Sequence, residues 1–136
     1  MQTHMMIDLE TLGNTHDAAI IQIGYCVFNK DKIIAAGEQR VDFDDALIYG
    51  KASGSTIKWW FEQSENARKS VCKATVYDKL SIALQGLSNA INEHNPQNFW
   101  AHASFDFPII GNAYKVTGLI NPINFRYTRD LRTSVS

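Results

Sequence analysis

Residues 5–13 have the sequence Met-Met-Ile-Asp-Leu-Glu-Thr-Leu-Gly, which is the most informative stretch of the chain for its fold. Residues 5–8 are a short apolar run that ends in acids, which is typical of a buried strand. Because side chains two apart on a strand point to the same face, Asp8 and Glu10 are expected to lie side by side. Two carboxylates that close repel each other unless one is protonated or a cation lies between them. The stretch therefore predicts a strand that ends either in a metal site or in an accidental pair of acids.

Two more strands are predicted directly after this one. Residues 18–28 and 32–41 are rich in β-branched and aromatic side chains, and Gly37 is expected to form a bulge in the second of them. The connections between the three strands are short, which favours an antiparallel meander. The aspartates at positions 42, 44 and 45 are interpreted as a solvated turn rather than a second metal site.

The middle of the chain is predicted to be helical. Ser55 or Thr56 is expected to cap a helix that carries two tryptophans, and Ser64 to begin another. A longer helix is predicted over residues 76–93. Its leucines and isoleucines recur at spacings of four, three and four, which places them on one face.

The last third of the chain returns to alternating strand and helix. Residues 98–103 are expected to form a strand, Ser104 to cap a helix that ends near residue 116, and residues 124–127 to form a fifth strand. Three antiparallel strands followed by strands reached through helices predict a mixed five-stranded sheet flanked by helices. The fold class is therefore α/β.

Composition limits the classes of protein that this chain can be. Its 136 residues suit a single domain, and a hydrophobic content of 45% argues against disorder. A net charge of -1 argues against a protein that binds nucleic acid by bulk positive charge alone. The two cysteines match no zinc-ligand spacing and suit a reducing cytoplasm. No signal peptide or membrane span is expected, so the sequence predicts a cytoplasmic protein.

A third acid stands at the start of the last predicted helix. Asp106 follows the apolar strand at residues 98–103, and it is flanked by Phe105 and Phe107. The helix dipole favours a carboxylate in the first turn, which is the simpler explanation of this acid. Its apolar neighbours instead suggest a buried position. Three carboxylates near strand ends are ligands that Mg²⁺ or Mn²⁺ prefers.

The order of these motifs resembles the DEDD superfamily of 3′–5′ exonucleases, which has an RNase H-like fold. The resemblance rests on residues 6–13, on Ile-Ile-Gln-Ile-Gly at residues 20–24, and on residues 100–108. Thr-Ile-Lys-Trp-Trp at residues 56–60 and Arg-Asp-Leu-Arg-Thr at residues 129–133 are similar to the branch that holds exoribonucleases of the mycobacterial type. The resemblance as a whole covers nearly the entire chain.

The resemblance implies a set of metal ligands. Asp8 would bridge two divalent ions, Mg²⁺ or Mn²⁺, Glu10 would ligate one of them, and Asp106 would hold the second. It also places the turn at Thr11 and Leu12 against the terminal nucleotide. Such a pair of ions can both activate the attacking water and stabilise the leaving oxygen.

Three further residues are candidate contacts for the substrate, single-stranded RNA or DNA with a free 3′ end. Trp59 belongs to a run of aromatic residues that could stack on bases, although consecutive helical positions cannot all face one way. Phe105 stands beside Asp106. Arg129 belongs to a basic cluster that could contact phosphate, and a solvated face is the simpler interpretation of that cluster.

The resemblance also implies a fourth aspartate and a histidine in an H-x4-D arrangement on a C-terminal helix. No histidine follows Asp130 in this sequence. We therefore expect residues 1–136 to form one exonuclease-like domain without that helix, and to be weakly active or inactive. The alternatives are a decayed relative that acts as a nucleic-acid-binding or protein-interaction module, and a related endonuclease. A homodimer is expected only because relatives commonly form one.

Overall fold

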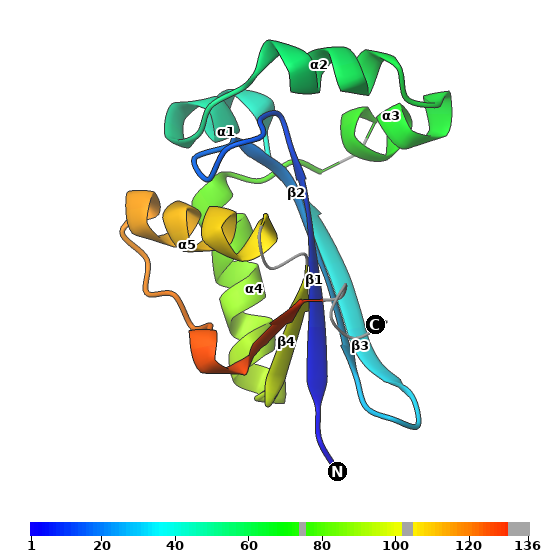
Figure 1. The fold of residues 1–136 in the computed structure, drawn as a ribbon, viewed down its shortest axis with the longest axis vertical. Coiled ribbons are helices and arrows are strands. Elements are labelled where there is room, and N and C mark those ends of the chain that lie inside the picture. Colours follow the sequence, from blue (N-terminus) through cyan, green and yellow to red (C-terminus); the bar gives the residue numbers. More distant parts are fainter. Residues whose placement is uncertain (74–75, 102–104, 131–136) are drawn as a thin grey trace.

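The computed structural model describes residues 1–73, 76–101 and 105–130. Five strands form one mixed sheet in the order β3-β2-β1-β4-β5 (Figure 1). The strands are β1 (His4–Thr11), β2 (Ile20–Phe28), β3 (Ile33–Arg40), β4 (Asn98–Ala101) and β5 (Thr128–Asp130). The β1–β2 and β2–β3 pairs are antiparallel, and β4 pairs parallel with both β1 and β5. The predicted α/β class is confirmed, and the arrangement is that of an RNase H-like fold.

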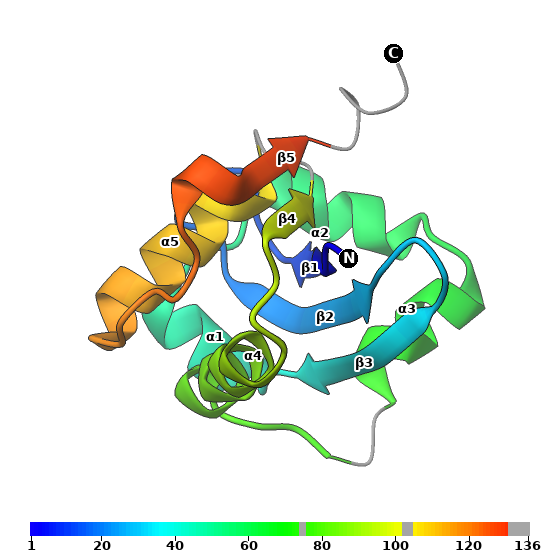
Figure 2. The same cartoon turned by 90° about the horizontal axis from the view of Figure 1, so that it is seen from below.

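The helices lie on one face and at one end of this sheet. They are α1 (Phe43–Tyr49), α2 (Gly54–Phe61), α3 (Glu65–Cys72), α4 (Leu80–His94) and α5 (Asp106–Thr117), with a short 3-10 helix η1 (Phe125–Tyr127) before β5. Figures 1 and 2 show α4 and α5 together against the sheet, and α2 beyond the end of β1. The fold therefore leaves much of the other face of the sheet uncovered in the part of the chain that is described.

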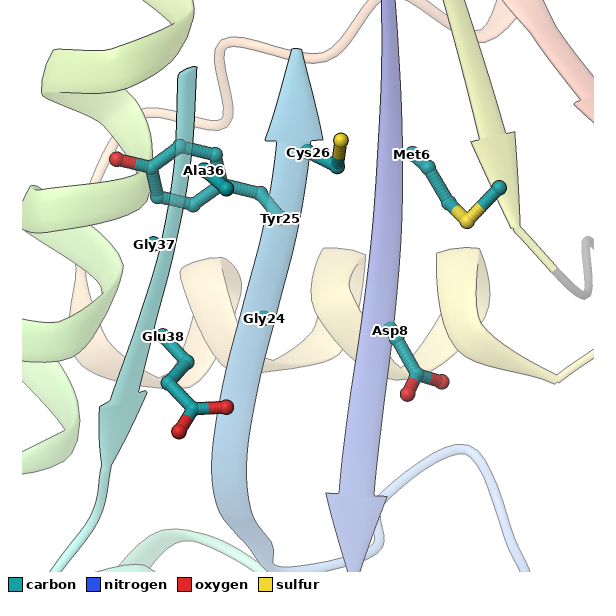
Figure 3. Close-up of a pocket in the computed structure, with 8 residues that line it drawn as sticks. All are labelled: Met6, Asp8, Gly24, Tyr25, Cys26, Ala36, Gly37 and Glu38. Atoms are coloured by element: carbon teal, nitrogen blue, oxygen red, sulfur yellow. The ribbon is translucent and has the colours of Figure 1, made fainter. Parts of the chain in front are cut away.

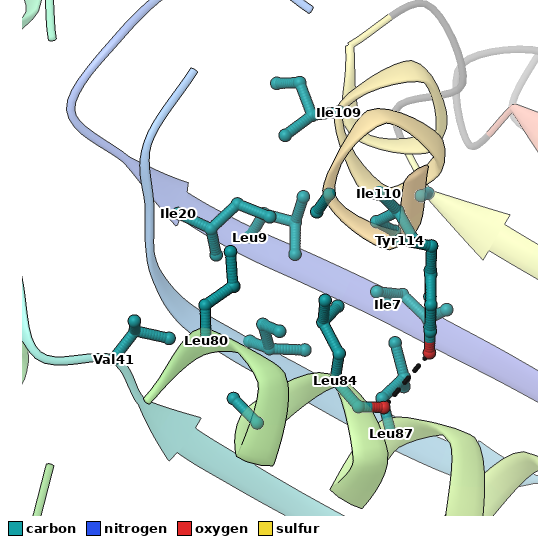
Figure 4. Close-up of a cluster of buried hydrophobic side chains, with 14 of the residues drawn as sticks. Ile7, Leu9, Ile20, Val41, Leu80, Leu84, Leu87, Ile109, Ile110 and Tyr114 are labelled. Carbon is teal, nitrogen blue, oxygen red and sulfur yellow. Dashed lines mark hydrogen bonds between the residues drawn. The ribbon is translucent and has the colours of Figure 1, made fainter. Parts of the chain in front are cut away.

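Alternation along β1 explains which face is covered. Met5, Ile7 and Leu9 are buried, whereas Met6 and Asp8 between them are exposed. The buried side chains pack against the apolar stripe of α4, as the spacing of that helix predicts (Figure 4). The stripe consists of Leu80, Leu84, Leu87 and Ile91.

Tyr114 of α5 links the two helices that cover the sheet. It is almost fully buried, and its hydroxyl lies 2.7 Å from Ser88 Oγ and 3.1 Å from the carbonyl oxygen of Leu84 (Figure 4). A buried tyrosine hydroxyl needs such partners. The same burial raises the pKa of Tyr114.

The acidic run after β3 is a helix start, so the predicted solvated turn is wrong. Asp42 caps α1, and its side chain accepts a hydrogen bond from the backbone N–H of Asp45. The Asp45 carboxylate in turn accepts a hydrogen bond of 2.7 Å from the backbone N–H of Leu80, at the start of α4. This second contact joins residues far apart in the sequence.

One predicted cap and one predicted bulge also differ from the structure. Ser53, not Ser55 or Thr56, caps α2, because its side chain accepts from the N–H of Thr56. Ser64 caps α3 as predicted. The register of the β2–β3 pair shifts at Phe28 and not at Gly37. Gly37 is needed for a different reason: a Cβ there would lie 2.7 Å from the Tyr25 hydroxyl.

Three element boundaries shift as well. The long helix begins at Leu80 rather than at residue 76, and the residues predicted as the fifth strand mostly form η1, so that β5 starts at Thr128. The α5 helix begins at Asp106 with Phe105 as its N-cap residue. Residues 102–103 of the fourth predicted strand, and the predicted cap Ser104, lie outside the described residues. Among the described helices, none combines the length and apolar character that crossing a membrane requires.

Candidate active site

Asp8 and Glu10 lie together near the carboxyl end of β1, on the face of the sheet that the helices leave open. Asp8 pairs across the sheet with Gly24, and Glu10 pairs with Gln22. Because Gly24 has no side chain, space remains between Asp8 on β1 and Glu38 on β3 (Figure 3). The shared face is confirmed. The expectation that the apolar strand leading to the acids is buried is confirmed for Met5 and Ile7 and wrong for Met6, which is exposed on the same face as Asp8.

The two carboxylates affect each other electrostatically. Burial, and then the negative charge of Asp8, raise the pKa of Glu10 above its ordinary value. Both effects disfavour the ionised form of the Glu10 side chain. A cation bound between the two acids would reverse the second effect and offset the first.

Glu10 also lines a hollow of about 350 Å³, which we call the Glu10 hollow. Its walls come from the end of β1, the turn that follows it, the α2 helix and the residue before α5. The lining side chains include Glu10, Thr11, Asn14, Ser55, Trp59 and Phe105. The structure thus brings three of the predicted substrate-contacting residues, Thr11, Trp59 and Phe105, together with a predicted metal ligand.

Backbone hydrogen bonds hold α2 against the end of β1. The N–H of Ser53 donates to the carbonyl oxygen of Leu12, and the N–H of Ala19 donates to that of Lys51, both over 2.9 Å. Gly50 makes this approach possible, because a Cβ there would lie 2.6 Å from the backbone of Ala19. The position of Trp59 relative to Glu10 is therefore set by these short backbone contacts.

The adjacent tryptophans have different surroundings. Trp59 is 49% exposed and faces the Glu10 hollow. Trp60 is half-buried, packs against the core, and donates a hydrogen bond of 2.9 Å from Nε1 to the carbonyl oxygen of Thr11. The two rings meet edge to face, with centroids 4.9 Å apart and an interplanar angle of 79°. Both tryptophans line the hollow, and Trp59 is the more exposed of the two.

Two predicted substrate contacts, Leu12 and Arg129, do not line the Glu10 hollow. A third, Thr11, lines it, but its hydroxyl already donates a hydrogen bond within the chain. The Leu12 side chain lines a separate apolar cavity of about 180 Å³ beneath α2 and α3. Arg129 on β5 pairs in register with Trp100, and its guanidinium donates to the carbonyl oxygens of Arg126 and Thr128. Thr11 lines the hollow, but its hydroxyl donates to the carbonyl oxygen of Gly13 over 2.8 Å.

Asp106 is the first residue of α5 and is only 3% exposed. It directly follows Phe105, which lines the Glu10 hollow. In the part of the chain that the structure describes, no three histidine, cysteine, aspartate or glutamate side chains gather closely enough to hold a metal ion as they stand. The paired acids Asp8 and Glu10 are therefore the organised part of the candidate site.

Sequence reasoning missed one residue of this surface, Gln22. The strand pairing places its side chain next to Glu10, on the same face of the sheet. Its Oε1 atom is buried and has no hydrogen-bond partner among the described residues. The sequence did carry a signal, because Gln22 is the single polar residue between the apolar residues 18–21 and Ile23.

Comparisons with known proteins identify the family of this chain. Residues 3–136 match the sequence model of the 3'-5' exoribonuclease Rv2179c-like domain. The chain is also 26% identical, over 157 residues, to an exodeoxyribonuclease of Enterobacteria phage T4. That alignment covers 96% of this chain and 69% of the phage protein. Because the family match extends over nearly the whole chain, the protein belongs to the 3'-5' exoribonuclease Rv2179c-like family and is a 3′–5′ exonuclease.

Proposed function

We propose that this protein removes nucleotides from the 3′ end of single-stranded nucleic acid in a reaction that depends on divalent metal ions. The observation that carries the proposal is the pairing of Asp8 and Glu10 on one strand face beside the Glu10 hollow. The raised pKa of Glu10 supports it, because acids that destabilise each other in isolation are stabilised by a shared cation.

The residues present fit a hard divalent cation. Asp8, Glu10 and Asp106 offer carboxylate oxygens, which Mg²⁺ and Mn²⁺ prefer over nitrogen or sulfur. We propose that Asp8 and Glu10 hold the ions, and that Asp106 joins them from the first turn of α5. Bound ions would supply Lewis-acid stabilisation of the charge that develops on the phosphate during hydrolysis.

The protein's own residues would bind and orient the end of the chain. Trp59 offers an aromatic face to the terminal base, and base stacking of this kind is tolerant of sequence. Thr11, whose carbonyl oxygen accepts a hydrogen bond from Trp60, and Phe105 form other parts of the same wall. A hollow of about 350 Å³ lies in the range typical of ligand pockets, which supports binding of one terminal nucleotide there.

The test is degradation of a 5′-labelled single strand, with RNA and DNA of the same sequence compared. Because this chain is expected to be at most weakly active, we expect a slow ladder shortened from the 3′ end in Mg²⁺ or Mn²⁺. We expect no products in EDTA and no cleavage of a circular single strand. Asp8→Asn should abolish the ladder. Asp31→Asn is the matched control, since Asp31 is an exposed acid in the turn between β2 and β3.

The outcome separates this proposal from its alternatives. Unchanged Mn²⁺-dependent degradation by Asp8→Asn would overturn the assignment of the site. Tight binding of the oligonucleotide in EDTA with no hydrolysis in Mn²⁺ would instead favour a nucleic-acid-binding module. Cleavage of the circle would favour an endonuclease.

The cellular location and the oligomeric state of the protein are also proposals. We propose a cytoplasmic location, because both Cys26 and Cys72 are free thiols. We also propose that the chain can form a homodimer, on the strength of the family resemblance alone. Light scattering at several protein concentrations measures the oligomeric state directly.

A further inference from the structure

Gln22 holds an unusual position on the open face of the sheet. It is half-buried on β2, directly opposite Glu10 on β1 and directly opposite Arg40 on β3. Directly opposite residues in an antiparallel pair have Cβ atoms about 5 Å apart. The amide of Gln22 is therefore within reach of any group that the Glu10 carboxylate binds.

The amide of Gln22 is fixed in one orientation. Its Nε2 donates a hydrogen bond of 3.0 Å to Glu38 Oε2, and the other oxygen of Glu38 forms an ion pair of 2.7 Å with Arg40. Both of these partners come from β3. With Nε2 held on the β3 side, Oε1 is the amide atom left for the β1 side, where Glu10 lies.

Gln22 Oε1 is buried without a hydrogen-bond partner among the described residues. Buried polar atoms in folded proteins are rarely left without a hydrogen-bond partner, so an unsatisfied one points to a ligand that completes it. Glu10 cannot supply a donor when it is ionised, because a carboxylate only accepts hydrogen bonds. A hard cation satisfies both groups at once, since amide and carboxylate oxygens are its usual ligands.

We propose that Gln22 Oε1 is an additional oxygen ligand, directly or through one water molecule, of the divalent cation held by Asp8 and Glu10. This inference rests on the proposed function. It adds a residue from β2 to a ligand set drawn from β1 and α5. The Arg40–Glu38–Gln22 chain of contacts would then hold the amide ready for the cation.

The experiment is a Mn²⁺ titration of the whole protein, followed by electron paramagnetic resonance of the free ion. We expect Gln22→Leu to weaken Mn²⁺ binding about tenfold, as loss of a supporting ligand commonly does. Gln39→Leu is the matched control. Gln39 pairs with Ile23 and lies near Gly86 of α4, on the opposite face of the same sheet. Its loss should leave the Mn²⁺ affinity unchanged.

A second measurement does not depend on how the variant folds. In a two-dimensional NMR spectrum of the wild-type protein, the side-chain amide resonances of Gln22 should shift on addition of Mg²⁺, and those of Gln39 should not. Resonances of Gln22 that stay in place would overturn the inference even if Gln22→Leu fails to fold.

The results distinguish this inference from the proposed function. If the wild type binds Mn²⁺, Asp8→Asn abolishes binding and a folded Gln22→Leu binds as tightly as the wild type, the role of Gln22 is wrong and the metal site stands. If the wild type binds no Mn²⁺, both proposals fall.

Discussion

The indole N–H of Trp60 donates a hydrogen bond of 2.9 Å to the carbonyl oxygen of Thr11, across 49 residues of sequence. This contact ties α2 to the end of the strand that carries Asp8 and Glu10. Through the edge-to-face contact between the two rings, it also sets the orientation of Trp59. One half-buried tryptophan therefore connects the strand of acids to the aromatic wall of the Glu10 hollow.

Trp60→Phe should lower the stability of the protein and impair the site together. The phenyl ring keeps much of the apolar packing but cannot donate to Thr11, so we expect a loss of about 1 kcal/mol in the free energy of unfolding. Urea denaturation followed by circular dichroism measures this loss. Trp59→Phe makes the same chemical change at an exposed side chain, and its unfolding free energy should stay within about 0.5 kcal/mol of the wild type. Equal losses in both variants would contradict this role of Trp60.

Trp59→Ala should weaken substrate binding with little effect on stability. Stacking of one base on an aromatic side chain contributes about 1–3 kcal/mol, so the KM for a single-stranded oligonucleotide should rise about tenfold or more. Because Trp59 is already 49% exposed, its removal opens no large internal cavity. Steady-state kinetics with a short labelled strand measures the change. A KM equal to that of the wild type would show that the base lies elsewhere.

Glu10→Gln should stabilise the metal-free protein at neutral pH. Burial and the charge of Asp8 raise the pKa of Glu10 in the folded protein above its unfolded value. The stability that Glu10 contributes is therefore fully present below the unfolded pKa and is lost as the pH rises through the folded pKa. The glutamine variant lacks this loss, so its advantage in melting temperature should be small near about pH 4 and larger near about pH 8.

The measurement for Glu10→Gln is thermal melting in EDTA across this pH range. Glu62→Gln is the control, because Glu62 is exposed at the end of α2. Addition of Mn²⁺ should reverse the order and make the wild type the more stable protein, since a ligand that binds only the folded state stabilises it. An advantage of the glutamine variant that falls as the pH rises would contradict the electrostatic account.

Tyr114→Phe should destabilise the packing of α5 on α4. The variant keeps the ring and loses a buried hydroxyl that contacts both Ser88 and the carbonyl oxygen of Leu84. We expect a loss of about 1–2 kcal/mol in the free energy of unfolding. Tyr127→Phe is the control, because Tyr127 is 47% exposed and its change should stay within about 0.5 kcal/mol. Urea denaturation of both variants provides the comparison.

The parts of the fold that follow from local periodicity could be predicted from the sequence. Alternation along residues 5–10 placed Asp8 and Glu10 on one face, and the apolar stripe predicted the buried face of α4. Periodicity could not assign the aspartates at 42, 44 and 45. Their helix is joined to the start of α4 through Asp45 and Leu80, which no local pattern reveals.

The sequence by itself determined the chemistry of the candidate site, because the strand period alone brings two carboxylates together. Only the tertiary structure decided which neighbours those acids have. The register of β1 against β2 puts Gln22 beside Glu10, and the backbone contacts of residues 50–53 turn Trp59 toward the hollow while Leu12 faces another cavity. These relationships depend on hydrogen bonds and packing between segments far apart in the chain. The local sequence of each segment does not specify which distant segment it will contact.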